Sequence, residues 1–153
     1  ELEPGVVLTE NPAILEYLAD LAKQPHLAPA AGSLQRARLR ELLAFLSAEL
    51  HKTFSPFFSG TALAPEQKQL ALQKMQRRLG NLNQQLQQQG PYLLGEQLSV
   101  ADIYAFVILS WTRYIQVSLA DWPALEDFFA RIAKRPCVVQ AMQAEGLIAK
   151  DDQ

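Results

Sequence analysis

The sequence predicts a mainly α fold, a helical bundle around a buried central helix, preceded by a short strand and a first helix. Three observations support this prediction. From residue 34 onward, apolar residues recur at helical spacing, without the alternation typical of strands. Residues 100–111 are apolar on every side, as expected for a helix surrounded by others. The β-prone run Val6-Val7-Leu8-Thr9 lies near the start of the chain.

The composition narrows the possible functions. A chain of 153 residues with 49% hydrophobic and 20% charged residues can bury one substantial core, so we expect one main globular domain. A formal net charge of -2 with scattered basic residues does not favour nucleic-acid binding. The apolar stretch 100–117 contains Asp102 and Arg113, so it does not predict a membrane span. The single cysteine, Cys137, cannot form an internal disulfide, which favours a cytoplasmic location.

A strand-to-helix connection opens the chain. Asn11 is a good N-cap and Pro12 suits the first helical position, so we expect a helix from there to about residue 21. Glu10 and Asn11 then lie at the positive end of the helix dipole, beside unpaired backbone N–H groups that suit a small charged ligand. Alternatively, they only start the helix, which contributes about 1 kcal/mol. A single strand is not stable without partners, so we expect the rest of its sheet to precede Glu1.

A linker follows the first helix. The segment 24–33 is rich in proline, glycine and small residues, and it is longer than most loops. His26 lies in this segment, where no nearby residue gives it a chemical role. We therefore interpret residues 25–33 as a linker between a unit of residues 1–24 and an all-helical domain of residues 34–153.

Two long helices open the helical domain. The first ends between Ser55-Pro56 and Gly60, and the second runs from Ala64-Pro65 to the break at Gly90-Pro91. The short loop between them predicts antiparallel neighbours. Each helix carries an apolar stripe for the core. The stripes are Leu39, Leu42, Leu43, Leu46, Leu50 and Phe54 in the first, and Leu70, Met75, Leu79, Leu82 and Leu86 in the second.

The central helix begins with Ser99-Val100-Ala101-Asp102. A hydroxyl and a carboxylate three residues apart suggest hydrolase chemistry, but this spacing is also that of a capping box, and the helix behind it is core. We therefore assign Ser99 and Asp102 a structural capping role. Two shorter helices follow, opening at Trp122-Pro123 and Arg135-Pro136, and Gly146 ends the last one. Their core residues are Leu125, Phe128, Phe129 and Ile132, then Val138, Val139 and Met142.

Ionisable residues gather at the end of the first long helix. Glu49, His51 and Lys52 place a carboxylate, an imidazole and an ammonium within four residues, a combination that can bind an anionic ligand. The alternative is a solvated helix face with an incidental histidine. Cys137 lies at a helix N-terminus, but no base lies near it in the sequence, so it does not predict a catalytic thiol. No spacing of metal ligands occurs, and we predict no metal site.

Four segments, taken in order, resemble a glutathione S-transferase of the bacterial beta class. Residues 8–20 resemble the last strand and third helix of its thioredoxin-like domain, and residues 47–58 resemble the start of its helical domain. Residues 98–104 match its buried capping motif, and residues 135–147 resemble its C-terminal helix. The resemblance implies that the first 24 residues are the end of a thioredoxin-like, glutathione-binding domain, followed by the transferase's C-terminal helical bundle.

The resemblance also implies a glutathione site. In such enzymes the residues at the positions of Glu10 and Asn11 hold the γ-glutamyl end of glutathione. The family usually has Ser or Gly where this chain has Asn11, and Ala44 replaces a usual Asn. The segment that borders glutathione corresponds to Ala48, Glu49, Leu50, His51 and Lys52, with His51 and Lys52 near the sulfur as candidate assistants.

The activity implied is the addition of glutathione to electrophiles, or its exchange with disulfides, by a cytoplasmic homodimer. The beta-class thiol and its Val-Pro turn correspond to positions upstream of Glu1, so we expect this chain alone to be catalytically incomplete. Phe54, Tyr104 and Trp111 are candidates for the second-substrate pocket, although aromatic residues at helical spacing also serve as core. Two alternatives remain: a non-enzymatic transferase-like helical module for protein association, and an unrelated helical bundle.

Overall fold

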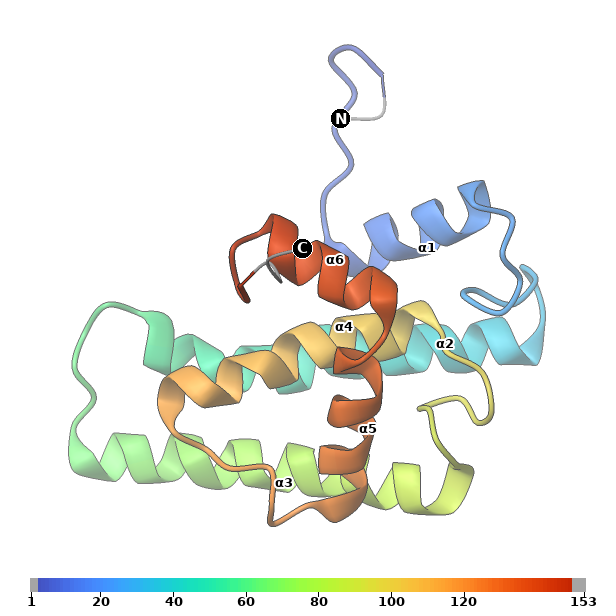
Figure 1. Cartoon of the computed structure of the whole chain (residues 1–153). Helices are drawn as coiled ribbons and strands as arrows, with labels where there is room; N and C mark the ends of the chain where they lie inside the picture. Colours follow the sequence, from blue (N-terminus) through green and yellow to red (C-terminus); the bar gives the residue numbers. More distant parts are fainter. Residues whose placement is uncertain (1–2, 150–153) are drawn as a thin grey trace.

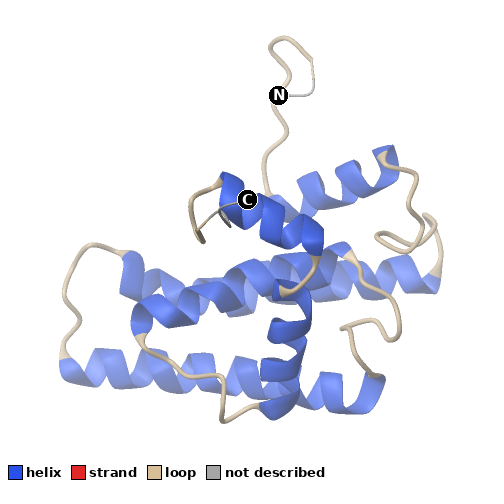
Figure 2. Cartoon of the chain, in the orientation of Figure 1, coloured by secondary structure: helices blue, strands red, loops and turns tan. Residues whose placement is uncertain are grey.

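The computed structural model describes residues 3–149, and these form an all-helical bundle (Figure 1). No strand forms among them (Figure 2), and the mainly α prediction is confirmed. The α-helices are α1 (Asn11–Leu21), α2 (Leu34–Phe45), α3 (Pro65–Gln89), α4 (Val100–Ser110), α5 (Pro123–Ala133) and α6 (Pro136–Ala144). Short helical turns of other types are η1 (Leu46–Leu50), η2 (His51–Phe58) and η3 (Trp111–Ile115). None of the helices within residues 3–149 has the length and apolarity needed to cross a membrane.

Helix α4 is the centre of the bundle, as predicted. It packs against α1, α2 and α5, while α5 crosses from α4 to the long helix α3 (Figure 1). Among the apolar side chains of α4, Val107 is exposed and the others are buried or half-buried. The buried residues of α4 are Val100, Ala101, Asp102, Tyr104, Ala105, Phe106, Ile108 and Leu109.

The predicted strand at residues 6–9 does not form. A single bridge joins Glu3 to Val6, and the chain then runs in irregular conformation to α1. The physical reason is that a strand needs the N–H and C=O groups of a neighbour, and the described residues provide none there. Helix α1 also begins one residue earlier than predicted, so Glu10 rather than Asn11 occupies the N-cap position.

The first long helix of the bundle is not one regular α-helix. Helix α2 ends at Phe45, η1 is a single π-helical turn, and η2 is a 3₁₀-helix. Pro56 explains the last change, because it lacks the N–H for an α-helical bond and its ring clashes with the carbonyl four residues back. The six apolar residues predicted for its stripe are nevertheless all buried.

Helix α3 corrects one predicted core residue. Leu70 is 53% exposed, whereas the neighbouring Ala71 is buried. Steps of four residues backward from Leu79 lead through Met75 to Ala71, so the buried face of the helix reaches Ala71 and bypasses Leu70. The rest of the predicted stripe is buried.

The last two helices pack less deeply. In α5 the predicted core residues are buried except Phe129, which stacks on Phe106 with ring centroids 4.8 Å apart. Helix α6 has no fully buried residue, so its three predicted core residues only cover the surface of the bundle. Gly146 ends α6 as predicted. Its φ of 69° is one that glycine adopts readily, and the Leu147 N–H donates to the Met142 carbonyl at 2.8 Å.

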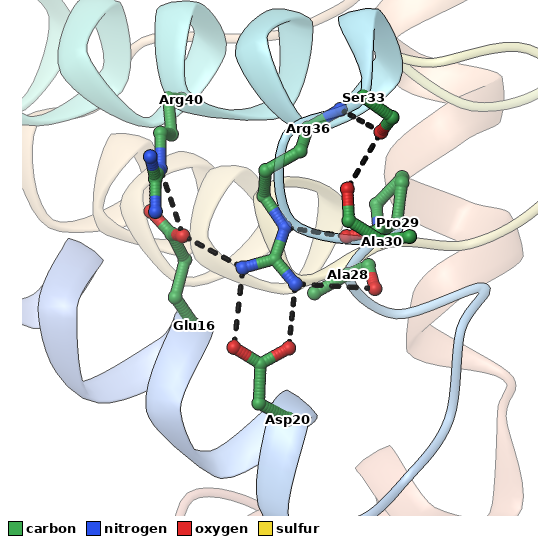
Figure 3. A network of polar contacts seen from close by, with 8 residues as sticks. All are labelled: Glu16, Asp20, Ala28, Pro29, Ala30, Ser33, Arg36 and Arg40. Atoms are coloured by element: carbon green, nitrogen blue, oxygen red, sulfur yellow. Dashed lines mark hydrogen bonds and ion pairs between the residues drawn. The ribbon is translucent and has the colours of Figure 1, made fainter.

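A buried arginine joins the predicted linker to the helices on both sides (Figure 3). Arg36 of α2 is only 3% exposed. Its guanidinium donates to Glu16 at 2.9 Å and to Asp20 at 2.5 Å, both on α1, and to the Pro29 carbonyl at 2.5 Å. Residues 25–33 are therefore held against α1 and α2 by one side chain, which the sequence analysis did not identify.

Candidate functional site

His51 lies where three elements of the bundle meet. It is the first residue of η2, and its Nδ1 lies 2.9 Å from the Tyr104 hydroxyl oxygen of α4. The Trp111 ring of η3 packs edge-on against the imidazole, with centroids 4.8 Å apart and planes at 72°. These contacts hold the imidazole in one place and leave it half-buried.

The start of α1 reaches the same place. Helix α1 contacts α4, and two of its residues at that end influence the pKa of Tyr104: Asn11 lowers it, and the charge of Glu10 raises it. Glu10 has a φ of 68°, a backbone conformation that is uncommon for a residue other than glycine. Such strained residues cluster at ligand sites, where the surrounding structure holds them in place. Tyr104 thus connects the two groups of candidate residues, at positions 10–11 and 49–52.

The segment 48–52 divides its side chains between surface and core. Ala48, Glu49 and Lys52 are exposed, whereas the Leu50 side chain is 0% exposed and lies in the core. Glu49 forms an ion pair with Arg78 of α3 at 2.5 Å. Only the backbone of Leu50 is therefore available to a ligand, and Glu49 is already engaged by a neighbouring helix.

Two further aromatic side chains pack against Trp111. Phe54 and Phe58 both pack edge-on against Trp111, with centroid distances of 5.7 and 6.0 Å. Phe54 is fully buried and Tyr104 is 5% exposed, so neither offers much surface to a substrate. Trp111 is half-buried, and Phe58, which the sequence analysis did not single out, is exposed.

Burial and nearby charge set the ionisation of the two central groups. Partial burial lowers the pKa of His51 below 6.5, and the Lys52 ammonium lowers it further. Burial raises the pKa of Tyr104 above 10.0, although its hydrogen bond to Asn11 acts in the opposite direction. The imidazole is therefore neutral at neutral pH, and the phenol keeps its hydrogen.

This ionisation makes the protein less stable in mild acid. The unfolded chain binds a proton on His51 at a higher pH than the folded chain does. The contribution of the neutral imidazole to the unfolding free energy is therefore complete above pH 6.5 and is lost as the pH falls below that value. We expect the unfolding free energy of the wild type, relative to His51→Gln, to be larger at about pH 7.5 than at about pH 5. Urea titrations at both pH values measure it, and an equal difference would contradict the expectation.

The remaining candidates lie elsewhere. Asp102 accepts hydrogen bonds from the N–H and hydroxyl of Ser99, each at 2.7 Å, which is the geometry of a helix cap. Cys137 is exposed on α6. No cluster of potential metal ligands occurs within residues 3–149. A cavity of about 1050 Å³ lies between α2, α3 and the linker and includes His26 but not His51. The candidate residues Glu10, Asn11 and Lys52 are exposed on the surface of the bundle.

Sequence reasoning named the residues at both ends of this site but missed the contact between them. It proposed Tyr104 as a candidate for the second-substrate pocket, and the structure places its hydroxyl oxygen 2.9 Å from His51 Nδ1. In the sequence, Tyr104 lies 53 positions from His51 and 93 positions from Asn11. No local sequence pattern indicates contacts over such separations.

Comparison with known proteins identifies relatives over nearly the whole chain. The family model "Glutathione S-transferase, C-terminal domain" matches residues 45–136. Glutathione S-transferase GstA of Escherichia coli O157:H7 is 32% identical over 146 residues, which cover 95% of this chain and 72% of that protein.

Solved structures agree. A sphingomonad glutathione S-transferase complexed with glutathione is 44% identical, with a TM-score of 0.88 over 96% of this chain and 72% of that one. A beta-class glutathione S-transferase of Sphingomonas chungbukensis is 41% identical, with the same TM-score and coverage. The resemblance to the bacterial beta class is confirmed, and the chain belongs to the glutathione S-transferase family.

Proposed function

We propose that this chain carries part of the glutathione site of a beta-class-like transferase, with glutathione as co-substrate. The observation that carries the proposal is the meeting of Asn11 and His51 at the Tyr104 hydroxyl. A relative that is 44% identical was solved with glutathione, which supports this choice of ligand. The parent reaction is the addition of glutathione to electrophiles or its exchange with disulfides.

We assign the γ-glutamyl end of glutathione to the start of α1. That end carries an ammonium and a carboxylate. The Glu10 carboxylate is matched to the ammonium, while the free N–H groups at the helix N-terminus suit the carboxylate. Both Glu10 and Asn11 are exposed, so a ligand can reach them.

We assign the sulfur end of glutathione to the face around His51. The exposed surfaces of Ala48, Glu49 and Lys52 and the backbone of Leu50 border it, with His51 and Lys52 assisting at the sulfur. Trp111 lines the second-substrate pocket, where the buried Phe54 packs edge-on against it and Tyr104 contacts the neighbouring His51. His51 and Lys52 are assistants in this proposal and do not make a complete catalytic site.

The domain organisation and assembly are part of the same proposal. Residues 1–24 belong to a thioredoxin-like domain, residues 25–33 are the linker, and residues 34–153 form the C-terminal helical domain. The matched relatives are longer than this chain, which covers 72% of GstA. We propose a homodimer in the cytoplasm, where the free thiol of Cys137 is compatible with reducing conditions.

Titration of the full chain with reduced glutathione by isothermal calorimetry tests the proposal. We expect binding, and we expect Glu10→Gln to weaken it about tenfold through loss of a charged hydrogen bond. Glu126→Gln on α5, a similarly exposed acid remote from α1, is the matched control and should leave binding unchanged.

Two outcomes would contradict the proposed site. Absence of binding at millimolar glutathione would remove glutathione as the ligand of this chain, and it would favour the helical module for protein association. Binding that is insensitive to Glu10→Gln would instead place the γ-glutamyl end elsewhere. Circular dichroism of each variant separates either outcome from loss of the fold.

A further inference from the structure

We infer that Tyr104 is a positioning residue that fixes the tautomer of His51, so that Nε2 carries the ring hydrogen and is the nitrogen offered to a ligand. The inference deepens the proposed function and rests on it only for the identity of the ligand. It concerns the contact between Tyr104 of α4 and His51 of η2.

The first step is the burial of the Tyr104 hydroxyl. Tyr104 is 5% exposed on the central helix, so its hydroxyl hydrogen needs an acceptor within the protein. A buried hydroxyl without an acceptor is destabilising.

The second step follows from the inventory of a phenol, which has one hydrogen and two lone pairs. If Nδ1 donated its hydrogen to this oxygen, the buried hydroxyl hydrogen would still need another acceptor, so donation from Tyr104 to Nδ1 is the arrangement that satisfies it. His51 Nδ1 lies 2.9 Å from the same oxygen, within ordinary hydrogen-bond distance. A neutral imidazole has one nitrogen that accepts and one that donates. When Tyr104 donates to Nδ1, Nε2 must carry the hydrogen.

The charged neighbours favour this arrangement. Partial burial and the Lys52 ammonium both disfavour a charged imidazole, so the ring stays neutral. A neutral imidazole exists in two tautomers, and the hydrogen bond to Tyr104 selects between them. The Glu10 carboxylate disfavours ionisation of the Tyr104 phenol, so the hydroxyl keeps the hydrogen that it donates. Glu49 is paired with Arg78 of α3.

Packing restricts the two rings to this geometry. Tyr104 is 5% exposed on the central helix, and its ring meets the imidazole at 71° with centroids 6.2 Å apart. The Trp111 ring packs edge-on against the same imidazole. The consequence is a neutral N–H donor at Nε2, which can bind an anionic atom such as a glutathione thiolate or carboxylate without first taking a proton.

Long-range ¹H–¹⁵N NMR of imidazole nitrogens tests the inference at about pH 7.5, because this experiment distinguishes a bare nitrogen from one that carries hydrogen. The chain has two histidines, and His26 is exposed in the linker, so it serves as an internal reference. His26→Gln assigns the signals. In the wild type, we expect the Nε2–H form of His51 to exceed the Nδ1–H form by about tenfold relative to His26.

The decisive variant is Tyr104→Phe, which keeps the ring and removes the hydroxyl. We expect its His51 tautomer ratio to move to that of His26. A wild-type ratio equal to that of His26, or a ratio unchanged in Tyr104→Phe, overturns the inference. The signals need no glutathione, so a chain that fails to bind it but shows the tautomer shift refutes only the proposed function.

Discussion

Replacing Asp102 with alanine should lower the free energy of unfolding by about 4 kcal/mol. The carboxylate accepts hydrogen bonds from the Leu93 N–H and the Ser99 N–H, each at 2.7 Å, and all three residues are buried. Alanine leaves both N–H groups buried without an acceptor, and each such group costs about 1–3 kcal/mol. The change therefore frees the loop before α4 as well as the cap of α4 itself.

A series of variants separates these contributions in urea titrations. Ser99→Ala removes only the hydroxyl and should cost about 1 kcal/mol, since the Ser99 N–H keeps its acceptor. Asp102→Asn offers one acceptor oxygen for three donors, so we expect an intermediate loss. The exposed Asp121→Ala serves as control. Because burial raises the pKa of Asp102, its charge is itself costly, and an Asp102→Asn variant more stable than the wild type would contradict our ranking.

Replacing Arg36 with alanine should cost about 3 kcal/mol. The buried guanidinium binds two carboxylates of α1 and two carbonyls of the linker, so its removal breaks five hydrogen bonds together (Figure 3). Removing one partner of a buried ion pair is costly because the other polar groups lose their counterpart. Arg36→Lys should be intermediate, because an ammonium cannot reproduce the planar fork.

Arg38 provides the matched control for Arg36. It lies on the same helix and forms an ion pair with Glu41 at 2.7 Å, but both side chains are more than half exposed. Such surface pairs contribute little, so Arg38→Ala should change the unfolding free energy by less than about 1 kcal/mol. Thermal and urea unfolding of both variants measure the contrast. Equal losses for the two arginines would show that the connection through Arg36 does not stabilise the bundle.

The same interaction predicts sensitivity to acid in the wild type. The hydrogen bond from Arg36 holds the pKa of Asp20 below its usual 3.8. A lowered carboxyl pKa adds stability above pH 3.8, and this stability is lost as pH falls below that value. Arg36→Ala should therefore show a shallower loss of stability in this acid range than the wild type does.

The local signals predicted much of the bundle. Helical spacing identified the central helix, Gly146 marked the end of α6, and all six residues of the first stripe are buried. Such features depend on neighbours within a few positions, which a sequence displays directly. The prediction of a strand at residues 6–9 was wrong because β-propensity does not supply a pairing partner. The prediction that Leu70 is a core residue was wrong because the adjacent apolar residue, Ala71, occupies the buried face of α3 instead.

The sequence predicted which residues belong to the candidate site, but not how they are arranged in space. Glu10, Asn11 and His51 stood out by type, yet their connection through Tyr104 required the packing of α1 and η2 on α4. Glu49 shows that closeness in the sequence does not by itself predict a contact. It stands two positions from His51, but neighbours at that spacing do not share a helix face, and it pairs with Arg78 instead.

The π-helical turn η1 has a consequence for how this site can vary among related chains. A π turn holds one more residue than an α turn, so it shifts the angular phase of every residue that follows. One residue corresponds to about 100° around a regular α-helix. The direction of His51 is thus a property of chain length between α2 and η2, and not only of residue identity. A relative that kept every polar residue of the site but lost one position from residues 46–50 would present a different face to its ligand.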